Sequence, residues 1–87
     1  MALYLSQHTL ACLTRQGANE LARRLLQGTS VRGRRVMVNL QEGKVLVEFE
    51  ASSREELERH LAAEKMHFDW LLRIELESTD GGLQPVA

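Results

Sequence analysis

Three histidines and an aspartate are the residues of this 87-residue chain best suited to metal or acid–base chemistry. The segment HLAAEKMHFDW, residues 60–70, holds His60, His67 and Asp69, whereas His8 lies near the N-terminus. Imidazole nitrogens and carboxylate oxygens bind first-row divalent metals, and two histidines with one carboxylate suffice for an open site. We therefore predict His8, His67 and Asp69 as candidate metal ligands, although their spacing matches no established metal-binding pattern.

Each of these residues also has a structural alternative. His60 flanks the apolar stripe of an expected helix, where a boundary residue hydrogen-bonded to solvent is common. His67 is placed to help end that helix, and Asp69 to accept hydrogen bonds from loop amides. For His8, which lies within an expected strand, a hydrogen bond to Tyr4, Glu48 or a partner subunit is sufficient.

Catalytic alternatives rest on the same histidine. His8 is a candidate general base with Glu48 or Glu50 as its partner, and Cys12 is a candidate nucleophile beside it. The alternative for Cys12 is a small buried apolar residue. The chain has no glycine-rich phosphate loop and no G-x-S-x-G motif, so phosphoryl-transfer and serine-hydrolase chemistry have no sequence support.

The elements that must position these residues follow the order β-α-β-β-α-β. The segment RRVMVNLQEGKVLVEFEA, residues 34–51, predicts a hairpin with a two-residue turn at Glu42 and Gly43. One face of that hairpin then has only apolar pairs, namely Leu40–Val45, Val38–Val47 and Val36–Phe49. Strands are also expected over residues 3–10 and over residues 70–77.

Two helices complete the pattern. The first is expected to begin near Thr14 and to stop near Gly28. The second has a capping signal, because Ser52 or Ser53 is followed three residues later by a glutamate. Its buried stripe is expected to contain Leu57 and Leu61.

These elements predict an α+β fold of the ferredoxin-like type, with a four-stranded antiparallel sheet and two helices on one face. Residues 1–77 form the expected single domain, and residues 78–87 an expected flexible C-terminal tail.

In this topology His8, His67 and Asp69 meet at one end of the sheet, with Cys12 and Glu42 nearby. The uncovered face is expected to show a set of exposed apolar residues: Tyr4, Met37, Leu46 and Leu71. Exposed apolar surface of this kind predicts a homodimer.

The composition of the chain indicates which partners and which cellular compartment to expect. No apolar run has the roughly 20 residues of a membrane span, so no membrane partner is expected. The single cysteine and the lack of a secretory signal favour the cytoplasm. Residues 1–44 contain seven Lys/Arg and two Glu, whereas residues 45–87 contain four Lys/Arg and ten Asp/Glu. The four aromatic residues and net charge of −1 disfavour nucleic-acid binding, and solvated faces are the favoured interpretation of the charge blocks.

Two segments resemble a known family. The stretch MALYLSQHTLACLT and the stretch GKVLVEFEASSREELERHLAAEKMHFDWLLRIELE are similar to small, mostly uncharacterised ferredoxin-like α/β proteins, some of which bind nickel. The resemblance spans about residues 2–77. It implies a dimeric fold and a divalent transition metal such as nickel, with His60 and His67 matching the family's motif and His8 matching loosely.

Three classes of function follow. The first is a ligand-binding, metal-binding or sensing module that acts as a dimer. The second is a small enzyme with its active site in the cleft of a dimeric α/β barrel. The third is a protein-interaction domain without a small ligand.

Overall fold

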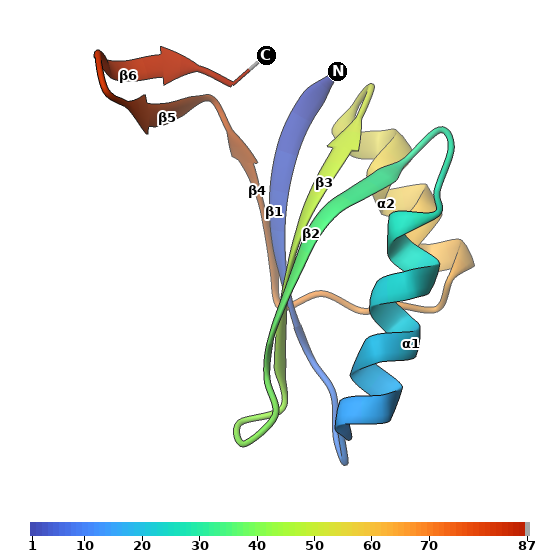
Figure 1. Cartoon of the computed structure of the whole chain (residues 1–87). Coiled ribbons are helices and arrows are strands. Elements are labelled where there is room, and N and C mark those ends of the chain that lie inside the picture. Colours follow the sequence, from blue (N-terminus) through green and yellow to red (C-terminus); the bar gives the residue numbers. More distant parts are fainter. Residues whose placement is uncertain (87) are drawn as a thin grey trace.

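The computed structural model describes residues 1–86, which fold into a sheet with two helices and a separate hairpin (Figure 1). The four strands of the sheet are β1 (Ala2–Thr9), β2 (Arg32–Asn39), β3 (Lys44–Ala51) and β4 (Trp70–Ile74). All neighbours are antiparallel, and the strand order is β2-β3-β1-β4. The helices are α1 (Arg15–Leu26) and α2 (Arg54–Ala63). The predicted α+β class with a four-stranded antiparallel sheet is confirmed.

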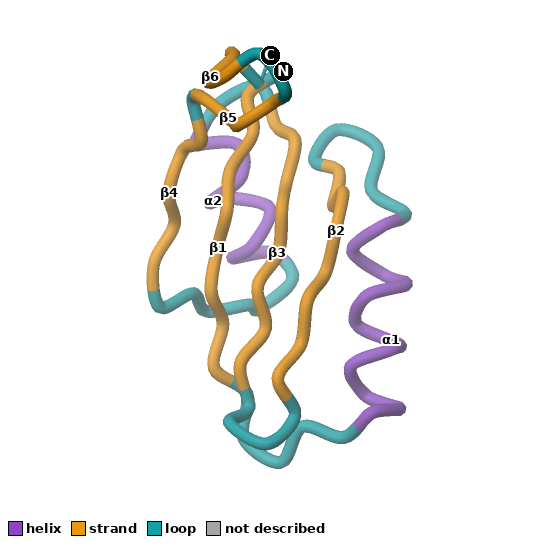
Figure 2. The backbone as a smooth tube through the Cα atoms, turned by 60° about the vertical axis from the view of Figure 1, so that its left-hand side comes forward, coloured by secondary structure: helices purple, strands orange, loops and turns teal. Residues whose placement is uncertain are grey.

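Both helices lie on the same side of the sheet, so its other face is uncovered (Figures 1 and 2). The core lies between the helices and the inner face of the sheet. Its fully buried side chains come mainly from β3 and α2: Val45, Val47, Phe49, Leu57 and Leu61. The predicted buried stripe of the second helix is therefore confirmed. No helix in residues 1–86 has the length and apolar character needed to cross a membrane.

The helix starts follow the capping signals in the sequence. The Thr14 side chain accepts a hydrogen bond from the Gly17 amide at 3.0 Å, and Ser53 accepts one from the Glu56 amide at 3.1 Å. These bonds satisfy amide groups that have no partner within the first helical turn. Local chemistry therefore determines where each helix begins.

The β2–β3 hairpin has the expected strands in a different register. Val38 pairs with Val45 and Val36 with Val47, a shift of two residues from the predicted pairs. The turn is longer than two residues because the Asn39 side chain accepts a hydrogen bond from the Glu42 amide at 2.9 Å. A shift by two keeps each side chain on its own face. The expected turn was wrong, and the expected valine face was right.

The faces expected for β1 and β4 were wrong. Tyr4 and Leu71 are 3% and 7% exposed and belong to the core, although both were expected on the uncovered face. Because successive side chains of a strand point to opposite faces, the next residues, Leu5 on β1 and Leu72 on β4, point outward. The cause lies in β1, where the inward residues Ser6 and His8 are polar yet fully buried. Assigning the polar residues of β1 to the solvent side therefore gave the wrong inner face.

The chain after β4 contains further regular structure. β4 ends at Ile74, three residues earlier than expected, and β5 (Leu76–Thr79) pairs with β6 (Gly82–Pro85). This hairpin occupies most of the segment expected as a tail. It projects from the sheet on the side away from the helices (Figures 1 and 2), and every residue of β5 and β6 is exposed.

Candidate functional site

His8 lies on the inward face of β1 and is fully buried. Its Nδ1 donates a hydrogen bond to the His67 carbonyl at 2.8 Å, because a carbonyl oxygen can only accept. Its Nε2 is 2.7 Å from the Ser6 hydroxyl, which donates to it when the imidazole is neutral. Both ring nitrogens are thus already bonded within the fold.

Burial favours the neutral form of this imidazole. It lowers the pKa of His8 below the ordinary value of 6.5, against the opposing effects of the His67 carbonyl and the Asp69 charge. Desolvation penalises the charged form because the interior solvates an imidazolium poorly. His8 therefore joins β1 to the segment before β4 as a neutral hydrogen-bonding residue.

Asp69 is the centre of an exposed polar network at the same end of the sheet. Its Oδ2 accepts hydrogen bonds from Thr9 Oγ1 at 2.5 Å and Gln7 Nε2 at 3.0 Å. Lys44 Nζ donates to Thr9 Oγ1 at 2.8 Å. The hydrogen bonds from Thr9 and Gln7 lower the pKa of Asp69 from 3.8, and the Lys44 charge acts in the same direction. The carboxylate is therefore ionised and bonded at neutral pH.

The fold brings His8, His67 and Asp69 to the same end of the sheet, as the topology predicted. However, His67 contacts His8 through its backbone carbonyl, and its side chain is exposed. His60 is half-buried in the last turn of α2. Cys12 is exposed in the β1–α1 loop. The expected neighbours therefore do not converge on one point.

The geometry of these residues bears on the predicted metal site. Among residues 1–86 there is no group of three or more His, Cys, Asp and Glu side chains that could hold a metal ion. The ring nitrogens of His8 and the Oδ2 of Asp69 are hydrogen-bonded to protein groups. Metal binding at His8, His67 and Asp69 stays a prediction, and ligation by His8 requires one of its two hydrogen bonds to break.

Thermal unfolding with divalent ions tests the metal prediction. With nickel, zinc or copper at roughly tenfold excess over protein, we expect His8→Gln to show the same metal-dependent change in Tm as wild type, because His8 has no free ligand atom. Comparison of each protein with and without the ion removes the effect of the substitution itself. A metal-induced rise in Tm that His8→Gln and His67→Ala both abolish would instead establish the predicted ligands.

The uncovered sheet face is apolar, as predicted, but of the four apolar residues expected on it only Met37 and Leu46 lie there. It carries a band of apolar side chains from all four strands, with the polar Gln7 between Leu46 and Trp70: Leu5, Met37, Leu46, Trp70, Leu72 and Ile74. Trp70 and Leu72 are 39% and 55% exposed. The strict alternation of apolar residues in β4 was the signal for this face, and it was assigned to the core instead.

The fold and these sites define a small α+β protein with a buried histidine at one end of its sheet and an apolar outer face. Comparisons with protein-family models, with curated proteins and with solved structures found no significant match to this chain. The resemblance to nickel-binding proteins stays a prediction.

Proposed function

We propose that this chain is a non-enzymatic, ferredoxin-like binding module that acts as a homodimer. The element order β-α-β-β-α-β together with the sheet order β2-β3-β1-β4 supports the ferredoxin-like assignment. In such an arrangement the helices cover one face only, and the other face is free to meet a partner.

The apolar outer face is the observation that carries the proposal. In β4 the larger apolar residues Trp70, Leu72 and Ile74 point away from the helices, and in β1 Leu5 does the same. Burying such side chains is favourable by about 25 cal/mol for each Å² removed from water. An extended apolar face left in water usually marks an interface.

A second copy of the chain suits this face. Both signs of charge lie beside the apolar band: Glu48 is between Leu5 and Arg35 on neighbouring strands, and Lys44 is near one end of the sheet. A twofold arrangement therefore has opposite charges available on both subunits. The β5–β6 hairpin projects on the same side and is positioned to contact the partner.

The enzyme alternative lacks its acid–base pair. His8 faces the helices, whereas Glu48 pairs with Leu5 and Glu50 with Leu3 on the outer face of the sheet. Residues that point to opposite faces of one sheet cannot share a proton directly. A binding role without catalysis fits this arrangement better.

The dimer is tested by Leu72→Glu. We expect wild-type protein to have twice the chain mass of 9.9 kDa in light scattering, and Leu72→Glu to have the mass of one chain. A carboxylate on β4 among Leu5, Trp70 and Ile74 would lose its hydration in the interface without gaining a partner. Because Leu72 is 55% exposed in the subunit, the fold itself should tolerate the change.

Leu26→Glu is the matched control. Leu26 is 44% exposed on α1, on the helical side of the molecule, so this variant should remain dimeric. Circular dichroism should show that both variants retain the wild-type fold. A wild-type protein that is monomeric at high micromolar concentration would refute the proposal.

A further inference from the structure

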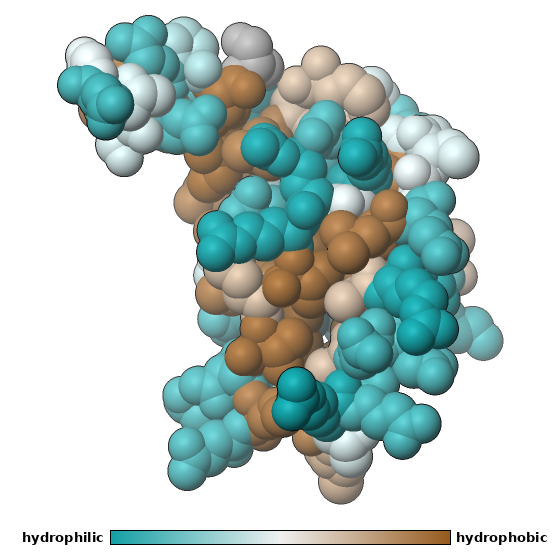
Figure 3. Space-filling view, viewed as in Figure 1, coloured by the Kyte–Doolittle hydropathy of each residue, from teal (hydrophilic) through white to brown (hydrophobic). Residues whose placement is uncertain are grey.

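A second apolar surface runs between α1 and β2. It is a groove of about 840 Å³ whose lining residues come from these two elements and the turn after β2: Arg15, Gln16, Ala18, Asn19, Ala22, Val36, Val38 and Leu40. Figure 3 shows apolar side chains along the middle of the molecule at this position, bordered by hydrophilic residues. This groove lies beside the β2 edge of the sheet, away from the outer face proposed for the dimer.

β2 is an edge strand. It pairs with β3 on one side only, so alternate backbone N–H and C=O groups on its other side have no strand partner within residues 1–86. Such an edge accepts an additional strand through main-chain hydrogen bonds. The irregularity between Gly33 and Arg35 limits the regular edge to the part of β2 after Arg34.

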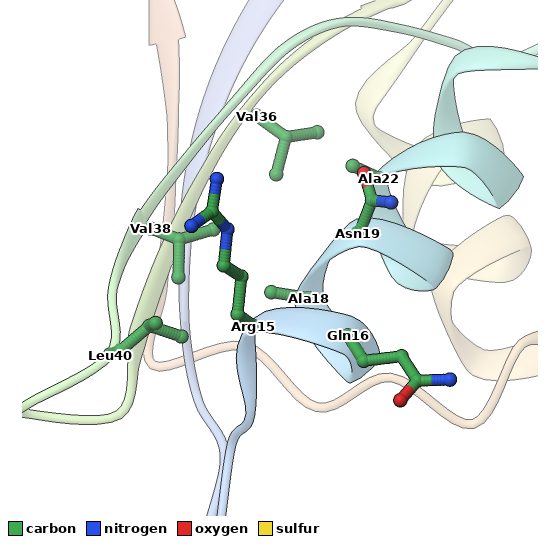
Figure 4. A pocket seen from close by; sticks show the side chains of 8 residues that line it. All are labelled: Arg15, Gln16, Ala18, Asn19, Ala22, Val36, Val38 and Leu40. Atoms are coloured by element: carbon green, nitrogen blue, oxygen red, sulfur yellow. The ribbon is translucent and has the colours of Figure 1, made fainter.

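The side chains beside this edge suit an extended segment. Val36, Val38 and Leu40 follow each other at every second position, and Val38 and Leu40 are 39% and 43% exposed. On α1 the facing residues Ala18 and Ala22 are small, which leaves room above the valines (Figure 4). An added strand would direct alternate side chains into this space, because successive residues point to opposite faces.

The positive charge in and beside the groove favours an acidic ligand. Figure 4 shows the Arg15 side chain extending from the start of α1 toward β2, and it has no ion pair or side-chain hydrogen bond within residues 1–86. In the part of the chain that the structure describes, Arg15 is the one charged residue of the groove lining, and β2 itself carries Arg32, Arg34 and Arg35, of which Arg34 lies 3.5 Å from Glu50. A second β2 would bring a like-charged edge against this one, whereas an acidic segment complements it.

We propose that this groove binds an extended acidic segment of a partner protein, added to the β2 edge. Alternate apolar side chains of the segment enter the space between β2 and α1, and an acidic residue at the end of this row meets Arg15. The carboxylates of the other row point to the outer side of the edge, beside Arg35 of β2. This interaction is independent of the proposed dimer, since it uses the edge of the sheet and not its outer face.

Fluorescence anisotropy with labelled peptides of about ten residues tests the proposal, a length sufficient to cover one strand. The probe alternates valine and glutamate, with glutamate in place of the valine at each end, so that an acidic side chain of the row entering the groove can reach Arg15. We expect it to bind, and we expect weaker binding as the salt concentration rises. A twin with lysine in place of glutamate should bind at least about tenfold more weakly through charge repulsion. A twin with proline at alternate positions should also lose binding, because proline cannot donate the strand hydrogen bonds.

Three variants locate the binding site. Arg15→Glu and Val38→Lys should each weaken binding of the acidic peptide by about tenfold or more, since each changes the groove directly. Arg24→Glu is the matched control: it makes the same charge change on α1 at an exposed residue outside the groove lining, and its binding should stay near wild type. Circular dichroism checks that all three variants fold.

The Leu72→Glu protein separates this proposal from the dimer, because it should bind the acidic peptide as wild type does. Equal binding of the acidic and basic peptides would overturn the proposal. So would equal weakening by Arg15→Glu and Arg24→Glu, which would indicate a diffuse attraction to positive charge instead of a groove.

Discussion

Phe49→Ala is expected to lower the free energy of unfolding by about 3–5 kcal/mol, the range typical of a fully buried aromatic residue replaced by alanine. Phe49 is 0% exposed, and its strand neighbours are Tyr4 on β1 and Gly33 on β2. Gly33 has no side chain to fill the void. The Leu25 backbone also lies close to Gly33, since a Cβ there would be 2.8 Å from the Leu25 carbonyl oxygen.

Urea unfolding followed by circular dichroism measures this loss. Leu26→Ala is the control, since Leu26 is an apolar residue that is 44% exposed on α1. Its effect should be below about 1 kcal/mol, as for most exposed positions. A similar loss in both variants would mean that Phe49 is not the centre of the core.

His8→Ala is expected to lower the free energy of unfolding by about 2–4 kcal/mol, because it leaves a void and removes the hydrogen-bond partner of two groups, one of them fully buried. Those groups are the Ser6 hydroxyl and the His67 carbonyl. The second bond joins β1 to the segment that leads into β4, so its loss should loosen the end of the sheet as well as the core.

His8 also makes stability depend on pH. Because the folded pKa of His8 lies below its ordinary value of 6.5, the unfolded chain binds the proton more readily. The stabilising contribution is therefore fully present above pH 6.5 and is lost as the pH falls through the folded pKa. The slope is at most about 1.4 kcal/mol per pH unit for one proton. The pKa of Asp69 is lowered from 3.8, so the contribution of Asp69 to stability is lost only in more acidic solution.

Urea unfolding at a series of pH values from neutral to mildly acidic distinguishes His8 from other groups. Wild type should lose stability across this series, and His8→Ala should lose much less. His60→Ala keeps the buried histidine and should follow the wild-type curve. If His8→Ala retains the full pH dependence, another group must be responsible for it.

Local signals in the sequence predicted the order of the sheet and helix elements and the helix starts. Thr14 and Ser53 cap their helices because their side chains accept hydrogen bonds from amides three residues later. These interactions lie within one turn of helix and need no information about the rest of the fold. The valine face of the β2–β3 hairpin was predictable for a similar reason, since alternation alone defines it.

The faces of β1 and β4 depended on contacts between distant residues. Ser6 and His8 are buried because they bond each other and the His67 carbonyl, a partner far along the chain. A pattern based on polarity assigns such residues outward and places Leu5 and Leu72 inward. The same reasoning explains the candidate site: its location at the end of the sheet was predictable, but the bonding of both His8 nitrogens was not.

The placement of β1 in the sheet has a consequence for the order of folding events. β1 is the first strand of the chain, yet its hydrogen-bonded neighbours are β3 and β4, and Leu3 pairs with Ile74. The β2–β3 hairpin and both helices are local structures, whereas both pairings of β1 require closure of long loops. Distant pairings of this kind slow folding. We therefore infer that β1 joins the sheet late, and that during synthesis on the ribosome it waits for most of the chain to emerge before its second edge is protected.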